Sequence, residues 1–108
     1  MIRLVVAYPA SGGTFFDFDY YLKTHLPASV ERMQPFGFVG WEVMRGESTV
    51  AGAPPPSLCV THLDFNSLEQ MQAGMQAHGA ELRADWPNYT DIDPVVTVVT
   101  LLDAQVLE

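Results

Sequence analysis

Apolar residues follow two different periods along this chain and predict six elements of secondary structure. Runs of β-branched and aromatic residues indicate strands, because these side chains pack well on a pleated sheet. Apolar residues that recur three and four positions apart indicate amphipathic helices. The pattern predicts strands over residues 2–8, 36–45, 57–64 and 94–102, a first helix between 17 and 35, and a second helix from 67 to about 82.

The predicted helices carry recognisable start signals. Asp17 precedes the first helix and either Asn66 or Ser67 precedes the second, and such side chains satisfy free backbone N–H groups. Pro27 interrupts the first helix because it lacks an N–H, so it either kinks the helix or begins a second segment at its own first turn. Gly37 and Gly40, in the second strand, are expected to mark a bulge or a close approach of another group.

The element order β-α-β-β-α-β predicts an α+β, ferredoxin-like fold with a four-stranded antiparallel sheet and two helices on one face. The last strand is apolar on both sides and is expected to be buried on both faces. Its two sides are Val95, Thr97, Val99 and Leu101, against Val96, Val98, Thr100 and Leu102. Because helices cover only one face of the sheet, we expect a second copy of the chain on the other. Residues 1–108 are expected to form one domain.

The charge and cysteine content of the chain exclude several classes of binding partner and cellular location. The chain has 5 Lys and Arg residues against 13 Asp and Glu residues, a net charge of −8, so nucleic acid and anionic membranes are not expected partners. Cys59 is the single cysteine, which excludes an intramolecular disulfide framework and favours a reducing, cytoplasmic location. No signal peptide is expected, and no apolar run approaches the ~20 residues needed to span a bilayer.

The first helix carries the first candidate site. Tyr21 and His25 are four residues apart and share one helix face, on which Phe18 also lies. An imidazole on an otherwise apolar inward face can serve as base, acid or ligand. The alternative is structural: His25 then donates one hydrogen bond near Pro27, where backbone carbonyls lose their partners.

A second candidate lies between residues 85 and 94. Trp86 and Tyr89, together with Asn88 and Thr90, are suited to line the mouth of a pocket. In the alternative, the aromatic side chains only plug one end of the sheet, while Asn88 and Asp91 bond their own backbone.

Metal and cofactor sites are not expected. His25, His62 and His78 lie 37 and 16 residues apart, without the short ligand pairs that mark zinc sites. Neither a nucleophile-elbow motif nor a glycine-rich phosphate-binding motif is present, so no organic cofactor is expected.

Two motifs resemble the EthD family, named for ethyl tert-butyl ether degradation. They are the Asp-Phe-Asp-Tyr-Tyr…His-Leu-Pro stretch over residues 17–27 and Asn-Tyr-Thr-Asp over residues 88–91. The resemblance covers nearly the whole chain. It implies a dimeric α+β barrel, in which two ferredoxin-like chains pack sheet against sheet, and a pocket between sheet and helices. The superfamily of this family includes cofactor-independent monooxygenases, lactone isomerases, decarboxylases or cyclases, and haem enzymes. The resemblance therefore implies one fold but leaves the function open among several classes.

From this we expect a cytoplasmic homodimer that binds a small, apolar, oxygenated organic molecule and transforms it by proton transfer. His25 is the expected acid or base, and Tyr21 and Tyr89 would position or polarise an oxygen. The expected apolar walls are Phe18, Trp41 and Trp86. Two alternatives stay open: a haem protein in which His25, or else His62 or His78, binds iron, and a non-catalytic accessory or ligand-binding module of a degradation pathway.

Overall fold

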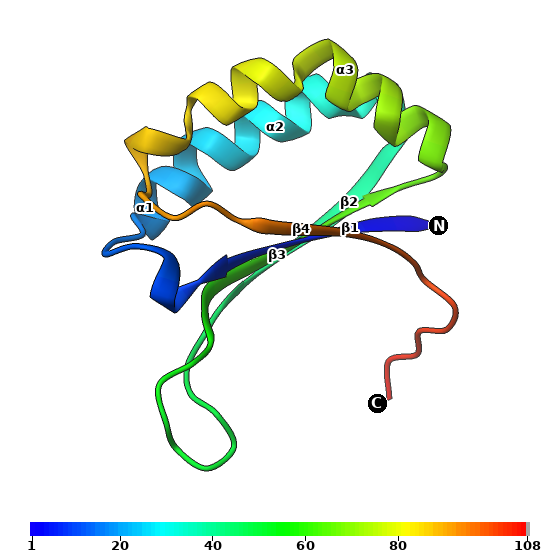
Figure 1. Cartoon of the computed structure of the whole chain (residues 1–108). Helices are drawn as coiled ribbons and strands as arrows, with labels where there is room; N and C mark the ends of the chain where they lie inside the picture. Colours follow the sequence, from blue (N-terminus) through cyan, green and yellow to red (C-terminus); the bar gives the residue numbers. More distant parts are fainter. Residues whose placement is uncertain (108) are drawn as a thin grey trace.

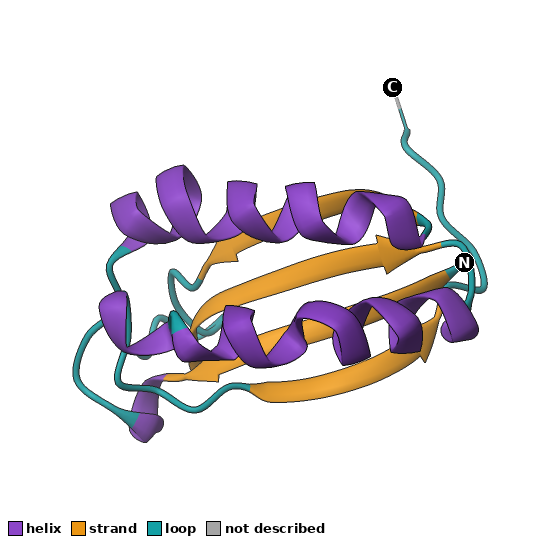
Figure 2. Cartoon of the chain, turned by 90° about the horizontal axis from the view of Figure 1, so that it is seen from above, coloured by secondary structure: helices purple, strands orange, loops and turns teal. Residues whose placement is uncertain are grey.

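Four antiparallel strands form one sheet in the computed structural model, which describes residues 1–107. The spatial order is β2-β3-β1-β4, as a ferredoxin-like fold requires. The strands are β1 Ile2–Pro9, β2 Phe38–Arg45, β3 Ser57–Phe65 and β4 Val95–Thr100. The two long helical segments lie side by side on one face of this sheet (Figures 1 and 2). The predicted α+β, ferredoxin-like fold is therefore confirmed.

The first helical segment is continuous but not uniform. It consists of α1 Phe18–Tyr20, a π-helical turn over Tyr21–His25, and α2 Leu26–Met33. The Leu26 N–H bonds to the carbonyl of Tyr21, five residues back, which is the π-helical spacing. Pro27 lies in the first turn of α2, directly after the π-helical turn, as one of the two expectations for this proline had it. The wider turn leaves Tyr21 and His25, four residues apart, both buried.

The second long helix, α3 Leu68–Ala84, starts at the expected cap. The Ser67 hydroxyl accepts a hydrogen bond from the backbone N–H of Gln70 at 3.2 Å. Midway along α3, Gly74 allows a close approach to α2. A Cβ at this position would lie 2.8 Å from the sulfur of Met33 and 3.1 Å from the Cβ of Phe36. The two helices therefore pack tightly at this end of the sheet.

The core between sheet and helices divides into two clusters. One is built from aliphatic, sulfur-containing and phenylalanine side chains, namely Leu4, Met33, Phe38, Phe65 and Met71. The other is rich in tyrosine and consists of Tyr8, Tyr21, Cys59, Tyr89 and Ile92. The polar hydroxyl groups of the buried side are thus gathered at one end of the molecule, the end that holds His25.

The expectation that the last strand is buried on both faces is wrong for the single chain. All residues of β4 are exposed, with Val95 at 58% and Val96 at 50%. β4 is an edge strand, and it pairs only with β1 among the described strands. Pairing of Val6 with Val96 and of Ala7 with Val95 places Val96 on the helix side and Val95 on the opposite face.

The strand β2 starts two residues later than expected, at Phe38. Gly37 has a φ of 72°, a left-handed conformation that ends the helical segment before the strand begins. The register shift between Phe38 and Gly40 confirms the expected bulge. Figure 1 also places the β2–β3 loop and the C-terminal tail on the side of the sheet away from the helices. In the described part of the chain, no helix is long and apolar enough to cross a membrane.

Candidate active site

A cavity of about 310 Å³ lies between the sheet and the helices, where the two core clusters meet. Its volume is at the lower end of the range for small-molecule sites. The walls are mostly aliphatic, and the polar groups are concentrated near His25. The lining residues are Leu4, Val6, Tyr8, Tyr21, His25, Leu26, Ser29, Met33, Leu63, Met75, Gly79, Leu82, Arg83, Trp86 and Val96.

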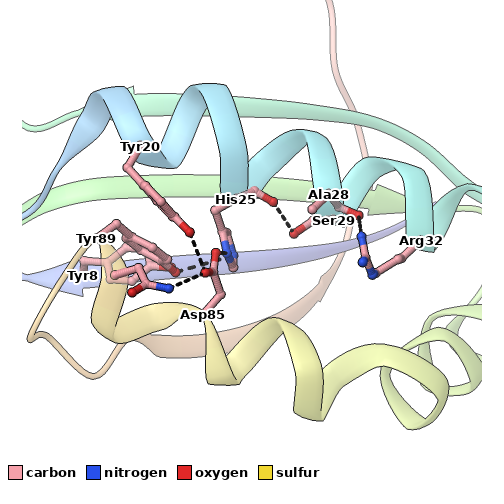
Figure 3. A network of polar contacts seen from close by, with 9 residues as sticks. Tyr8, Tyr20, His25, Ala28, Ser29, Arg32, Asp85 and Tyr89 are labelled. Carbon is pink, nitrogen blue, oxygen red and sulfur yellow. Dashed lines mark hydrogen bonds and ion pairs between the residues drawn. The ribbon is translucent and has the colours of Figure 1, made fainter.

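The imidazole of His25 is held by a carboxylate. Its Nδ1 lies 2.9 Å from Oδ2 of Asp85, which directly follows α3 (Figure 3). Since a carboxylate only accepts hydrogen bonds, Nδ1 carries the proton in this pair and Nε2 keeps its lone pair. The ring is also stacked on Tyr21, with centroids 5.5 Å apart and planes inclined by 17°. The pair therefore fixes both the tautomer and the orientation of His25.

Asp85 is itself fixed by two further donors. Its Oδ1 accepts hydrogen bonds from the Tyr20 hydroxyl at 2.7 Å and from the Asn88 side-chain amide at 2.8 Å. Burial alone would raise the pKa of the Asp85 carboxyl, but the hydrogen bonds from Asn88, Tyr20 and His25 outweigh burial and lower it. Asp85 is therefore a stable anion at neutral pH.

The pKa of His25 is lowered from its ordinary value. Burial is the larger cause, and it outweighs the hydrogen bond and the negative charge of Asp85, both of which raise this pKa. The imidazole is consequently neutral at pH 7 and able to accept a proton.

A second hollow, on the outer surface between α2 and α3, is lined by Tyr20, Arg32 and Asp85 among others. Asp85 thus lies between the buried imidazole and the outer surface.

On the Nε2 side of His25, two tyrosines form a hydroxyl pair. The Tyr89 hydroxyl lies 3.5 Å from Nε2 and 2.9 Å from the hydroxyl of Tyr8. Tyr8 lines the cavity, whereas Tyr89 is fully buried behind it. Burial is the main cause that raises the pKa of both phenols, so both remain neutral hydrogen-bond donors.

The hydroxyl of Tyr21 is used elsewhere. It forms a hydrogen bond of 2.7 Å with the hydroxyl of Thr61 on β3, and the thiol of Cys59 lies 3.8 Å from the same Thr61 oxygen. Burial raises the pKa of the Cys59 thiol to about 11, so it is a neutral core group. Tyr21 therefore presents its ring to His25 and to the cavity, with its oxygen already bonded.

Sequence-predicted residues fall into two groups. His25, Tyr21 and Trp86 line the cavity, and Tyr89 contacts His25 from behind. Phe18 and Trp41 are not among the lining residues.

The two outlying aromatic residues have other neighbours. Phe18 packs on Phe16 at a centroid distance of 4.6 Å, beneath the guanidinium of Arg45. Trp41 stacks on Phe38 and is half exposed. Phe18 and Trp41 therefore do not line this cavity in the single chain, and their role as apolar walls of a ligand site stays a prediction.

The loop after α3 joins the site as well as closing the sheet. The Asn88 side-chain amide donates to the carboxylate of Asp85, and Asp91 accepts hydrogen bonds from the backbone N–H groups of Thr14 and Phe15. These contacts differ from the bonds to the local backbone that the structural alternative predicted for both side chains. Sequence reasoning also assigned no role to Asp85, Tyr20 or Tyr8. Their contacts with the site span about 60 residues or more, and no local spacing reports such distances.

The other histidines lie apart from this site. His62, on β3, pairs with Glu42 at 3.0 Å, and His78, on α3, pairs with Glu81. Among residues 1–107, no group of three or more His, Cys, Asp or Glu side chains is placed to hold a metal ion.

Fold and site together define a ferredoxin-like α+β protein with an apolar cavity beside a carboxylate–histidine pair. Comparison with solved structures narrows this class. An EthD-like protein from Ralstonia eutropha JMP134 superposes with a TM-score of 0.88 at 32% identity, covering 96% of this chain and 94% of that chain. An EthD family protein from Bacillus halodurans C-125 gives a TM-score of 0.67 at 17% identity, over 94% and 99% of the two chains.

The chain belongs to the EthD-like family, as its two motifs indicated. HapK from Hahella chejuensis shares the fold, with a TM-score of 0.63 at 14% identity over the full length of both chains. Neither a family model nor a curated protein sequence matches the chain.

Proposed function

We propose that this protein is a cytoplasmic enzyme that moves a proton on a small, apolar, oxygenated organic molecule without an organic cofactor. The observation that carries the proposal is the His25–Asp85 pair. Asp85 holds the proton on Nδ1, which leaves the lone pair of Nε2 free to act as a base, and His25 is one of the residues that line the cavity. A neutral base near pH 7 in an apolar cavity is suited to taking a proton from a carbon next to a carbonyl group.

The hydroxyl groups of Tyr8 and Tyr89 supply the hydrogen-bond donor that this proton transfer needs at the substrate oxygen. When Tyr89 donates its proton to the oxygen of Tyr8, the Tyr8 hydroxyl is free to donate to a ligand oxygen in the cavity. The proton then passes from the substrate carbon to Nε2 of His25, and the electron pair of the broken C–H bond moves onto the carbonyl oxygen. A preorganised donor at that oxygen stabilises the enolate in an apolar site.

Haem binding has weaker support in this geometry. The Nδ1 of His25 is committed to Asp85, and its Nε2 faces the Tyr89 hydroxyl at 3.5 Å. His62 and His78 each pair with a glutamate away from the cavity. Proton transfer and iron ligation would both replace the Tyr89 contact at Nε2, so the weaker support for haem lies in the lack of a further histidine among the residues that line the cavity.

We also propose that the functional form is a homodimer joined through the helix-free face of the sheet. That face presents Val5, Ala7, Val60, Val95 and Thr97 beside a polar group of both signs, Arg3, Asp64, Glu42 and His62. Apolar area beside mixed charges suits a self-complementary, two-fold contact. The exposed apolar strand β4 and the C-terminal tail, with Leu102 and Leu107 both at 91% exposure, support a second copy as the covering layer.

The proton-transfer proposal is tested with 2-tetralone, a readily enolised apolar ketone. The protein is incubated with it in D2O, and loss of the α-proton signal is followed by proton NMR. We expect faster exchange than in buffer, and a loss of roughly 100-fold or more in His25→Gln, which retains one hydrogen bond but no base. His78→Gln is the matched control, because His78 lies on α3 and pairs with Glu81.

Exchange that is equally fast in the His25→Gln protein would refute the role of this residue. Binding of the ketone without any exchange would assign the protein to the ligand-binding class instead. In either case the thermal midpoint of each variant is measured alongside, so that lost folding is not mistaken for lost chemistry.

A further inference from the structure

Arg83 differs from the other cationic side chains of the chain. It lies near the end of α3, is exposed, and also lines the cavity, so it stands at the rim between cavity and solvent. Among residues 1–107, no carboxylate forms an ion pair with Arg83. The other four cations each have one: Arg3 with Asp64, Lys23 with Asp19, Arg32 with Glu81 and Arg45 with Glu47.

The cavity lining holds no acidic side chain among the described residues, although the chain has 13 of them. Only His25 and Arg83 among the lining side chains carry or acquire a positive charge. With a net charge of −8, the protein as a whole repels anions, so an anionic ligand depends on a local cation. Arg83 supplies that cation at the edge of an otherwise apolar cavity.

Gly79 makes room beside Arg83. It is buried in the interior of α3 and lines the cavity one turn before Arg83. A Cβ at this position would meet only the Nη2 of Arg83 at 3.6 Å and the Cβ of Met75 at 3.9 Å, both ordinary contacts. An alanine would fit here and would favour the helix, so the glycine is not required by packing. Gly74, by contrast, is required by the close contact with Met33.

We propose that the ligand of this cavity is a small apolar carboxylic acid whose carboxylate pairs with Arg83, while the space left by Gly79 admits its body. The planar guanidinium matches a carboxylate with two parallel hydrogen bonds. The aliphatic walls take the ring or chain, and the far end reaches His25 and Tyr8. This inference rests on the proposed function for the chemistry at that far end and adds the class of substrate.

The test compares 2-naphthoate with 2-naphthamide, two ligands of nearly the same shape that differ in charge. Binding is measured by calorimetry and by the fluorescence of Trp86 in a Trp41→Phe background, since Trp86 lines the cavity and Trp41 does not. We expect the acid to bind roughly tenfold more tightly than the amide or better. Arg83→Gln should remove this preference by lowering the affinity for the acid to about that for the amide.

Arg45→Gln is the matched control, because it removes the same charge from an exposed residue outside the cavity. The preference for the acid should survive in this variant. Equal affinities for acid and amide in the wild type, an equal loss in the Arg45 and Arg83 variants, or no binding of either ligand would each overturn the proposal.

Gly79→Ala tests the second part of the inference. The methyl group should raise the thermal midpoint, because alanine favours the helix, and weaken binding of both naphthalene ligands, because it occupies the cavity. Unchanged affinity would overturn the assignment of this cavity. Failure of the proposed proton transfer is distinguishable, since it leaves 2-tetralone exchange insensitive to His25→Gln without altering the acid–amide preference.

Discussion

Asp85 Oδ2 lies 2.9 Å from Nδ1 of His25, although 60 residues separate the two along the chain. One residue belongs to the end of a π-helical turn, and the other directly follows α3. Since both helical segments lie on the same face of the sheet, their packing decides whether this pair forms (Figures 2 and 3). The candidate chemistry therefore depends on how the two helices meet.

Replacing Asp85 with Asn should change the pH dependence of proton exchange. The charge and hydrogen bond of Asp85 raise the pKa of His25, so their loss lowers it further and moves the acidic limb of the profile to lower pH. The maximal exchange rate should fall roughly tenfold or more, because the tautomer is no longer fixed. Exchange of 2-tetralone over a pH series measures both effects.

Asp93→Asn is the control for this change, because Asp93 is an exposed carboxylate on the same loop. If the Asp85 variant moved the limb to higher pH instead, the assignment of His25 as the titrating base would be contradicted.

Burial of neutral His25 should make folding sensitive to mild acid. The folded pKa is lower than that of the unfolded chain, so the unfolded chain binds more protons just below pH 6.5. The free energy of unfolding should therefore fall as the pH drops below 6.5, by up to about 1.4 kcal/mol per pH unit, until the folded pKa is passed. Urea unfolding at several pH values measures this slope.

His25→Gln should reduce that slope between pH 6.5 and 5. The carboxylates with lowered pKa values, such as Asp85, also lose stabilising charge in acid, but they do so below their ordinary value near 4. An unchanged slope in the glutamine variant would mean that His25 takes up its proton over the same pH range in the folded and the unfolded chain, which would contradict a lowered pKa in the folded protein.

Tyr21→Phe should lower stability and spare the chemistry. The ring that stacks on His25 is retained, while the Thr61 hydroxyl loses its 2.7 Å partner inside the core. We expect the free energy of unfolding to fall by about 1–2 kcal/mol, with little change in 2-tetralone exchange. Should exchange collapse while stability holds, Tyr21 would instead be a group that contacts the substrate.

Val95→Asp should prevent dimerisation. Val95 lies on the helix-free face and is 58% exposed in the single chain, so the change costs the monomer little. A face-to-face dimer would bury about 2,000 Å² or more, and a carboxylate in its centre would be desolvated without a partner. Analytical ultracentrifugation should show dimers for wild type and monomers for this variant.

Leu22→Asp provides the comparison, because Leu22 is exposed on the helical side of the molecule. It should remain dimeric. A wild-type chain that sediments as a monomer at micromolar concentration would contradict the proposed assembly.

The strands and helices of the fold could be predicted from the sequence. Strand runs, helix stripes and the capping residue Ser67 are local signals, and each leads to an element where the structure has one. A bulge at Gly37 or Gly40 was also expected, because glycine weakens a strand, and the structure has it next to Gly40, whereas Gly37 precedes the strand. The π-helical turn was not, since neither apolar period nor propensity distinguishes it from an α-helical turn beside Pro27.

Only part of the candidate site could be predicted from the sequence. His25 stood out as a titratable side chain on an apolar helix face, but its partner Asp85 resembled any acidic residue at a helix end. Trp41 was expected in the pocket because it is large and apolar, yet its strand lies next to β3, away from the centre of the cavity. How far a cavity extends across a sheet depends on how the helices pack over the sheet, which no local sequence pattern reports.

The π-helical turn has a consequence for comparisons of this chain with its relatives. In this turn a backbone N–H bonds to the carbonyl five residues back, instead of four as in an α-helix. The segment therefore holds one residue more than an α-helix of the same span. Each residue turns an α-helix by about 100°. Deletion of a single exposed residue here, such as Lys23, would restore regular winding and turn the preceding residues Tyr20 and Tyr21 relative to His25 and α2. Sequence alignment of this segment therefore needs to allow a one-residue gap, and a homologue without the extra residue would keep the fold while losing the contacts of Tyr20 with Asp85 and of Tyr21 with His25.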